Sequence, residues 1–162
     1  MITRIIGVDP GYDRLGVAVV ERENGKENLI FSDCLSSTKT DSFPLRLKTI
    51  GQAFEKLIIE NRPQAVALEK VFFASNKKTA AAISEVRGVL TYLATVHNLP
   101  VIDLTPLQVK VAVTGYGTAS KEQVAVMVKR LITAKKELKS DDEIDAIAVA
   151  IAGLARQSAS EE

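Results

Sequence analysis

The chain has 162 residues with 46% hydrophobic and 25% charged side chains, which is ordinary for a soluble single-domain protein, and its formal net charge of +1 does not by itself indicate a nucleic-acid partner. No apolar run approaches the roughly 18–20 residues that a membrane helix needs, and the N-terminus lacks a signal-peptide pattern. The single cysteine, Cys34, cannot form an internal disulfide, so we expect a cytoplasmic protein with no membrane partner.

The first part of the chain predicts three strands joined by tight turns. Residues 2–8 are rich in β-branched side chains and end at the turn signal Asp9-Pro10-Gly11. Residues 15–21 and 28–36 are predicted to be the second and third strands, with a turn at Asn24-Gly25 between them. Two short connections of this kind indicate an antiparallel meander.

Helices and short strands alternate in the rest of the chain. Apolar residues spaced as on one helical face predict a helix over residues 43–61, which Arg62-Pro63 ends. Two short apolar runs, residues 65–68 and 100–104, are predicted strands. Further helices are expected over residues 79–97, from the cap Thr105-Pro106 to a loop at 115–120, over 121–134, and from the capping box at Ser140 to about residue 156.

This order of elements predicts an α/β fold class. The expected sheet is mixed and five-stranded, with three antiparallel strands followed by two parallel ones, and helices cover both faces. Right-handed crossovers place the fourth strand beside the first, and the resulting order resembles the ribonuclease H-like architecture. We expect a single nuclease domain over residues 1–157 and a flexible C-terminal tail over residues 158–162.

Charge is unevenly distributed along the second half of the chain. Residues 107–139 carry seven basic side chains against two acids, whereas residues 140–145 hold four acids and no base. A basic segment beside a concentrated acidic point suits a metal-dependent enzyme that acts on a polyanion. The alternative is a solvated helix face followed by an acidic helix start.

Two acids are expected at the same edge of the sheet. Asp9 follows the first strand and Glu69 follows the fourth, and both strands are otherwise apolar. If these strands are parallel neighbours, both carboxylates project from the carboxyl ends of the strands, where ligand sites of such sheets lie. Taken singly, Asp9 could be a turn residue, and Glu69 could be a surface acid paired with Lys70 or Arg87.

The last helix adds further acids to this edge. Asp142 and Asp145 share a helix face, but so do Asp141 and Asp145, and spacing alone does not choose between the two pairs. Glu143 is better explained as the capping-box partner of Ser140. Acids in a first helical turn also complement the helix dipole without any other role, whereas Asp145 lies within an apolar helix body.

Several converging carboxylates without histidine or cysteine ligands predict hard divalent cations. Two such ions, roughly 3.5–4 Å apart, can clamp an in-line phosphoryl displacement, and no protein nucleophile is then needed. The prediction depends on the conjunction of the acids and not on any one of them.

At this point the sequence resembles the bacterial RuvC resolvases over nearly its whole length. The matching blocks, in the family's order, are Gly7-Val8-Asp9-Pro10-Gly11, Leu68-Glu69-Lys70-Val71-Phe72, Glu85-Val86-Arg87-Gly88-Val89, Gln108-Val109-Lys110, Lys121-Glu122-Gln123-Val124 and Asp142-Glu143-Ile144-Asp145-Ala146-Ile147-Ala148. The set is specific, although a strand ending in Asp is common to many ribonuclease H-like proteins. Residues 12–15 depart from the family's pattern ahead of Gly16, and the C-terminal tail is short.

The resemblance implies a crossover junction endodeoxyribonuclease. Such an enzyme binds a four-way (Holliday) junction as a homodimer and nicks two strands symmetrically during recombination and repair. A branch-migration complex of RuvA and RuvB is a candidate partner, and Mg²⁺ or Mn²⁺ is the implied cofactor, with two ions per site. The implied metal ligands are Asp9, Glu69, Asp142 and Asp145, which favours Asp142 over Asp141.

Basic and aromatic residues are the expected DNA contacts. Lys121 and Lys110 match family positions implicated in DNA contact or catalysis, and we expect Lys121 to be catalytic. Phe72 corresponds to an aromatic that stacks on an unpaired base, and we expect one of Phe72 and Phe73 to be buried and the other, Phe72, exposed. Further candidates for phosphate contact are Lys77, Lys78 and Arg87.

Two other functions use the same residues. A related ribonuclease H-like nuclease that cuts RNA or RNA/DNA hybrids would need the same four acids. A non-catalytic junction-binding protein would have lost an acid, and all four are present. Cys34 is expected to be a buried strand residue, and the small residues of the helix over 79–97 suit either a dimer contact or internal packing.

Overall fold

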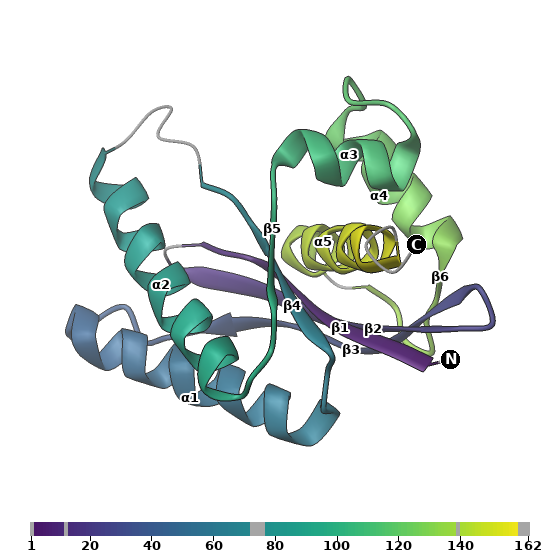
Figure 1. The fold of residues 1–162 in the computed structure, drawn as a ribbon. Helices are drawn as coiled ribbons and strands as arrows, with labels where there is room; N and C mark the ends of the chain where they lie inside the picture. The colour runs from purple at the N-terminus through teal and green to yellow at the C-terminus, as the bar shows by residue number, and fades with distance from the viewer. Residues whose placement is uncertain (1, 12, 72–76, 139, 159–162) are drawn as a thin grey trace.

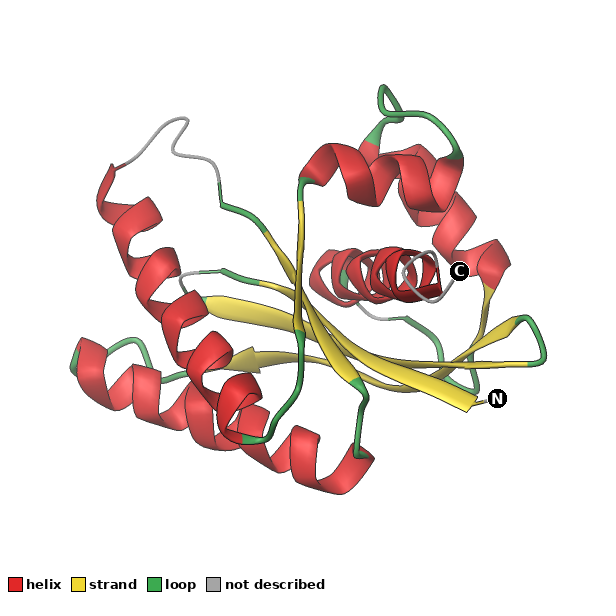
Figure 2. Ribbon diagram, in the orientation of Figure 1, coloured by secondary structure: helices red, strands yellow, loops and turns green. Residues whose placement is uncertain are grey.

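A computed structural model describes residues 2–11, 13–71, 77–138 and 140–158 of the chain. It folds into one mixed sheet with helices on both faces (Figures 1 and 2). The elements are β1 (Ile2–Asp9), β2 (Arg14–Glu23), β3 (Lys26–Ser36), α1 (Phe43–Asn61), β4 (Ala65–Glu69), α2 (Lys77–Val96), β5 (Val101–Leu104), α3 (Pro106–Thr114), α4 (Lys121–Leu131), β6 (Ile132–Thr133) and α5 (Asp141–Ser158).

The sheet has the strand order β5-β4-β1-β2-β3-β6. The meander β1–β2–β3 is antiparallel, and its second turn places Asn24 and Gly25 at φ 52° and 76°, the positive values that a tight hairpin turn requires. Strand β4 pairs with β1 in parallel, and β5 pairs with β4 in parallel. The predicted placement of the fourth strand beside the first is therefore confirmed.

The sheet has six strands. The prediction of five was wrong, because it missed the short strand β6. The helix predicted over residues 121–134 ends at Leu131, because Ile132 adopts an extended backbone and buries its side chain. Residues Ile132 and Thr133 pair in parallel with Glu27 and Asn28 at the edge of β3. Both are β-branched, so leaving the helix costs little and burying Ile132 offsets it. Three elements also begin earlier than predicted: β2 at Arg14, β3 at Lys26 and α2 at Lys77.

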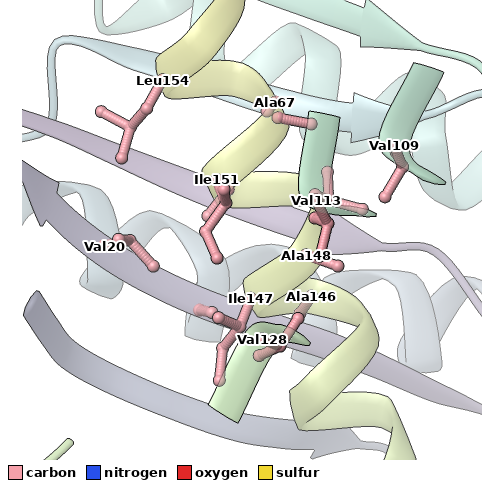
Figure 3. Close-up of a cluster of buried hydrophobic side chains, with 14 of the residues drawn as sticks. Val20, Ala67, Val109, Val113, Val128, Ala146, Ile147, Ala148, Ile151 and Leu154 are labelled. Carbon is pink, nitrogen blue, oxygen red and sulfur yellow. The ribbon is translucent and has the colours of Figure 1, made fainter. Parts of the chain in front are cut away.

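Alternate residues of the strands fill two cores. Ile6, Val8, Val17 and Val19 pack against α1 and α2 on one face. On the other face Ile5, Ala18 and Val20 pack against α5, which α3 and α4 cover in turn (Figure 3). The period of two along each strand is thus what divides the core into two layers.

Helix α5 lies directly on the sheet because small residues line the contact. A Cβ at Gly7 would lie 2.6 Å from the Cβ of Ala150, closer than real side-chain carbons approach. The facing residues of α5 are mostly alanine, including Ala146 and Ala150, so the helix backbone comes close to β1 and β2. This close approach brings the first turn of α5 to the strand ends that carry the predicted acids.

No helix in the described part of the chain is long and apolar enough to cross a membrane. Of the tail predicted at residues 158–162, Ser158 ends α5 and the rest lies outside the described residues.

Candidate active site

Asp9 and Glu69 lie side by side at the carboxyl ends of two paired strands. Val8 of β1 is aligned with Leu68 of β4 in the parallel ladder, so the next residue of each strand ends at the same edge. The two carboxyl groups are hydrogen-bonded to each other, with Glu69 as the donor. The structure therefore brings together the two acids that the sequence predicts at this edge.

Burial and mutual repulsion act on both carboxyl groups of this pair. Burial raises the pKa of Glu69 to about 8, and the negative charges of Asp9 and Asp145 contribute to the rise. Burial also raises the pKa of Asp9, which Asp145 and Asp142 repel, while the hydrogen bond from Glu69 and the charge of Lys121 act in the opposite direction. A cation bound at this edge of the sheet would relieve the repulsion between these acids.

The first turns of α5 supply Asp142 and Asp145. Both side chains are about one quarter exposed, at 26% and 28%, whereas the side chain of Asp141 is 80% exposed. Asp142 and Asp145 both raise the pKa of Asp9, so each of them lies within electrostatic reach of Asp9. Of the two spacings that the sequence left open, the pair Asp142 and Asp145 is the one directed toward the strand ends.

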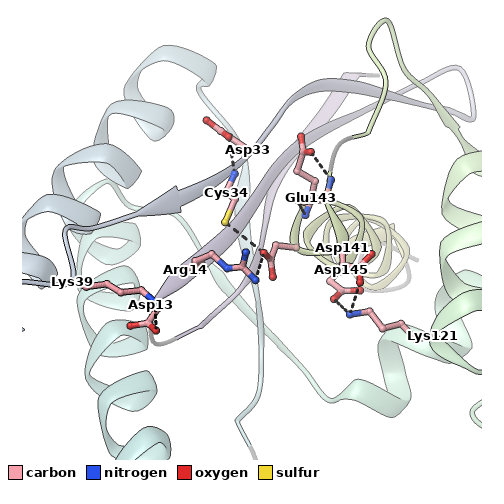
Figure 4. A network of polar contacts seen from close by, with 11 residues as sticks. Asp13, Arg14, Asp33, Cys34, Lys39, Lys121, Asp141, Glu143 and Asp145 are labelled. Atoms are coloured by element: carbon pink, nitrogen blue, oxygen red, sulfur yellow. Dashed lines mark hydrogen bonds and ion pairs between the residues drawn. The ribbon is translucent and has the colours of Figure 1, made fainter.

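Basic side chains flank the acids on two sides of α5 (Figure 4). Lys121, at the start of α4, places its Nζ 3.0 Å from Oδ2 of Asp145 and 3.7 Å from Oδ2 of Asp141. Arg14, at the start of β2, places Nη2 3.3 Å from Oδ2 of Asp142. Lys121, the expected catalytic lysine, therefore lies beside the acids, whereas Arg14 was missed because nothing in its spacing links it to residue 142.

Cys34 differs from its expected role as a buried strand residue. It is partly exposed on β3, and its Sγ lies 3.6 Å from the same Oδ2 of Asp142 that Arg14 contacts. Burial and the negative charge of Asp142 raise the pKa of the thiol, so it remains protonated and donates to the carboxylate. The reason is register: Cys34 pairs with Gly16, and the absent side chain of Gly16 leaves space for the first turn of α5.

Glu143 is turned away from the site, as its capping role predicts. Its side chain accepts a hydrogen bond from the Ser140 backbone N–H at 3.2 Å, and the Ser140 hydroxyl accepts one from the Glu143 N–H at 3.3 Å. The carboxylate is only 3% exposed and also contacts Lys136 and the Ser32 hydroxyl. These contacts attach the N-terminus of α5 to β3 and so locate the neighbouring Asp142.

A cleft of about 210 Å³ opens beside the acids. Glu69, Asp145, Lys110 and Lys121 line it, with apolar residues of α3, α4 and α5 forming its wall. The capping boxes at Thr105 and Ser120 begin α3 and α4 at defined residues, which is why both lysines reach the cleft. Lysines that border a carboxylate cleft are suited to holding a phosphate group next to it.

The other predicted DNA contacts are placed only in part. Phe72 and Phe73 lie outside the described residues, so the question of which is exposed is not tested. Lys77 and Lys78 begin α2, but their side chains are also outside the described part. Arg87 lies on α2 with its guanidinium against the end of β4, where it contacts the backbone of Glu69.

A buried arginine near the site was also missed. Arg46 of α1 is 5% exposed and donates to Oδ1 of Asp13 at 2.9 Å and to the Ser37 hydroxyl at 2.9 Å. Asp13 belongs to the turn that follows Asp9, so Arg46 attaches this turn to α1. The helical periodicity of residues 43–61 could have indicated that Arg46 is buried, because residue 46 falls on the apolar face of the helix next to Ile50.

The donor chemistry of the site fits a hard divalent cation. All four acids can supply oxygen ligands, and burial together with their mutual repulsion raises the pKa values of Asp9 and Glu69. Within the described residues, no three potential ligands stand close enough together to form a finished metal site. Asp142 is instead ion-paired with Arg14, and Asp145 with Lys121.

Comparison with known proteins points to a single family. The model of the family described as crossover junction endodeoxyribonuclease RuvC matches residues 5–153. Proteins of that description from Carboxydothermus hydrogenoformans and Alkaliphilus metalliredigens are 41% identical over 151 residues and 42% identical over 147 residues. These matches cover 93% and 91% of this chain, and 94% and 90% of the two relatives.

Solved structures agree with this assignment. A structure described as Thermus thermophilus RuvC in complex with Holliday junction substrate is 29% identical, with a TM-score of 0.88 over 98% of this chain and 96% of that chain. The yeast mitochondrial Holliday junction resolvase Ydc2, at 19% identity and a TM-score of 0.72, shares the fold.

Proposed function

Because the chain belongs to the RuvC family of crossover junction endodeoxyribonucleases, we propose that its four-carboxylate site resolves four-way (Holliday) junctions by metal-dependent nicking of two strands. The observation that carries the proposal is the convergence of two strand-end acids with two acids of α5 at one edge of the sheet. The match covers 94% of the relative from Carboxydothermus hydrogenoformans.

The proposed metal ligands are Asp9, Glu69, Asp142 and Asp145, and the proposed cofactor is Mg²⁺ or Mn²⁺ with two ions per site. Bound divalent ions supply Lewis acidity and an activated water for phosphodiester hydrolysis. The four carboxylates would hold the ions, and a bound cation would offset the repulsion between Asp9 and Glu69. Lys121 is the proposed catalytic residue: its ammonium group lies 3.0 Å from Asp145 and would stabilise the negative charge that develops on the phosphate.

The proposed DNA surface extends from the cleft toward α2. Lys110 and Lys121 border the acids and would contact phosphates next to the cut. Lys77, Lys78 and Arg87 are proposed for more distant phosphates, and Phe72 for stacking on an unpaired base. Phosphate contacts hold the junction in register with the acids, whereas a stacking ring selects a distorted helix over an ordinary one.

We also propose that the enzyme acts as a homodimer through α2. Ala81, Glu85, Gly88, Tyr92 and Val96 follow one another along one side of this helix, and all five are exposed. Tyr92 and Val96 are 67% and 52% exposed, and a Cβ at Gly88 would meet nothing. The small side chains of Ala81 and Gly88 would let a second helix approach closely, Tyr92 and Val96 would supply apolar contact, and a two-fold dimer would present two sites to two symmetric strands.

Two further proposals come from family membership alone. Action on recombination intermediates places the enzyme in the cytoplasm. A branch-migration complex of RuvA and RuvB is the proposed partner, because such a complex would deliver junctions to the resolvase.

A nicking assay tests the proposed function. A synthetic four-way junction is incubated with the wild type, Asp9→Asn and the control Glu23→Gln, in Mg²⁺ or EDTA. Glu23 is an exposed acid at the far end of β2, so its substitution should leave cutting unchanged. We expect paired nicks at symmetric positions in Mg²⁺ with the wild type and the control, and none in EDTA or with Asp9→Asn.

The other outcomes point to other functions. Tight junction binding without cutting, in both Mg²⁺ and Mn²⁺ and across varied crossover sequences, would indicate a binding protein. Cutting of an RNA/DNA hybrid without any action on junctions would indicate the related nuclease.

A further inference from the structure

Arg87 connects the helix α2 to the ends of two strands. Its Nη1 donates to the backbone carbonyl oxygen of Glu69, the last residue of β4. Its Nη2 donates to Oδ1 of Asp103 on β5, at 2.6 Å. The arginine side chain is 17% exposed, whereas the Asp103 side chain is 47% exposed, so the contact with the Glu69 carbonyl is the better shielded of the two. One guanidinium therefore ties together three elements at the edge of the sheet where the acids lie.

The two strands that Arg87 joins are neighbours in the parallel ladder. Asp103 is aligned with Leu68, and Glu69 with Leu104. The ladder itself continues to Lys70, whose N–H donates to the Leu104 carbonyl at 2.7 Å. Arg87 adds a second link at the same level from outside the sheet, and this link ends on the backbone of the residue whose side chain is a proposed metal ligand.

We propose that Arg87 is a positioning residue that holds Glu69 at the metal site, with Asp103 as its anchor. A charge-assisted pair of hydrogen bonds from one planar guanidinium fixes direction as well as distance. Because the Arg87 contact is to the backbone of Glu69, it fixes the point from which the Glu69 side chain extends toward Asp9. This inference rests on the proposed role of Glu69 as a metal ligand.

This role differs from the phosphate contact predicted for Arg87 from the sequence. A phosphate contact acts only when DNA is bound, whereas a positioning residue acts on metal binding with no DNA present. Lysine separates the two roles, since it keeps the charge that a phosphate contact needs but cannot reach a carbonyl and a carboxylate with one planar group.

Arg4 offers a matched control at the opposite end of the sheet. It also bridges a backbone carbonyl, that of Asn61 at 2.6 Å, and a carboxylate, that of Glu21 through Nε at 3.0 Å. It lies near the start of β1, far along the strand from Asp9. Arg4→Lys should therefore disturb an equivalent pair of bonds without reaching the metal site.

The test measures Mn²⁺ binding to the DNA-free protein as the rise of its thermal unfolding midpoint with Mn²⁺ concentration. We expect the half-saturating Mn²⁺ concentration to rise about tenfold in Arg87→Lys, the scale of losing a group that orients a metal ligand. A rise of about threefold is expected in Asp103→Asn, which keeps one acceptor oxygen. Arg4→Lys should match the wild type in Mn²⁺ binding, even if its midpoint without metal falls.

Two results would overturn the inference while leaving the proposed function intact. One is wild-type Mn²⁺ binding by Arg87→Lys, with or without weaker junction binding. The other is an equal loss of Mn²⁺ binding in Arg87→Lys and Arg4→Lys, which would indicate general destabilisation. Failure of the proposed metal site looks different: the wild type itself would then respond to Mn²⁺ no more than Glu69→Gln does, and both proposals would fall together.

Discussion

Substituting Gly16 by alanine should separate the two halves of the active site. Gly16 of β2 is paired with Asp9 of β1, and the first turn of α5 lies over it. A Cβ at this position would lie 2.9 Å from the carbonyl carbon of Asp142 and nearer still to its oxygen, inside the 3.0 Å that real Cβ atoms respect. The obstacle is backbone, so it cannot rotate away as a side chain would.

The size of the effect follows from this overlap. Restoring ordinary contact requires the first turn of α5 to move by about 1 Å, and overpacking of this kind costs roughly 1–3 kcal/mol of stability. The movement carries Asp142 and Asp145 away from Asp9 and Glu69. Misplacing catalytic groups by about 1 Å lowers turnover by roughly a hundredfold. We therefore expect Gly16→Ala to fold, to unfold at a lower temperature, and to nick junctions about a hundredfold more slowly.

Gly153 provides the control, because it is a second close contact of α5 with the sheet. A Cβ there would lie 2.7 Å from the Cβ of Ala67, near the C-terminal end of the same helix. Gly153→Ala should lose stability on a similar scale yet keep most of its turnover. Junction nicking at saturating Mg²⁺ and thermal unfolding measure the two quantities. Equal turnover in the two variants would refute the reasoning that Gly16 acts through the position of the acids.

Three further predictions concern the charged groups. The pKa of Glu69 in the folded protein, about 8, exceeds its ordinary value of 4.5, so the metal-free protein should lose stability as pH rises between these values. Glu69→Gln should remove much of this pH dependence, and in EDTA at pH 8 its free energy of unfolding should exceed that of the wild type by about 1–3 kcal/mol. A wild-type unfolding midpoint that does not fall over this range would contradict it. Glu143→Ala should lower the free energy of unfolding, measured with urea, by about 2 kcal/mol, because it removes a buried carboxylate and a helix cap. Glu137→Ala, at an exposed position, should lower it little. Lys121→Met should bind Mn²⁺ more tightly, since an ammonium no longer competes for Asp145, yet cut more slowly; weaker Mn²⁺ binding would show that the lysine supports the site.

Local signals in the sequence were sufficient for most of the fold. The Asn24-Gly25 turn, the apolar run at residues 65–68 and the helix caps at Thr105 and Ser140 each act within a few residues, so pattern reasoning identifies them. Strand β6 was not predicted, because a helical pattern continues through Ile132. Only pairing with the edge of β3 makes an extended backbone favourable there.

The sequence by itself determined the architecture and the two strand-end acids, because hydrophobic periodicity and right-handed crossovers leave few alternatives for where β1 and β4 end. Tertiary structure alone decided which neighbours each acid meets. That Asp142 and not Asp141 faces the strand ends, and that Arg14 and Cys34 meet it there, depends on the rotation and height of α5 over Gly16. Such contacts join residues more than a hundred positions apart, and no local pattern encodes them. They arise only when α5 packs on the sheet, because the missing Cβ of Gly16 lets the helix backbone come close, and this close packing sets the position of the Asp142 carboxylate.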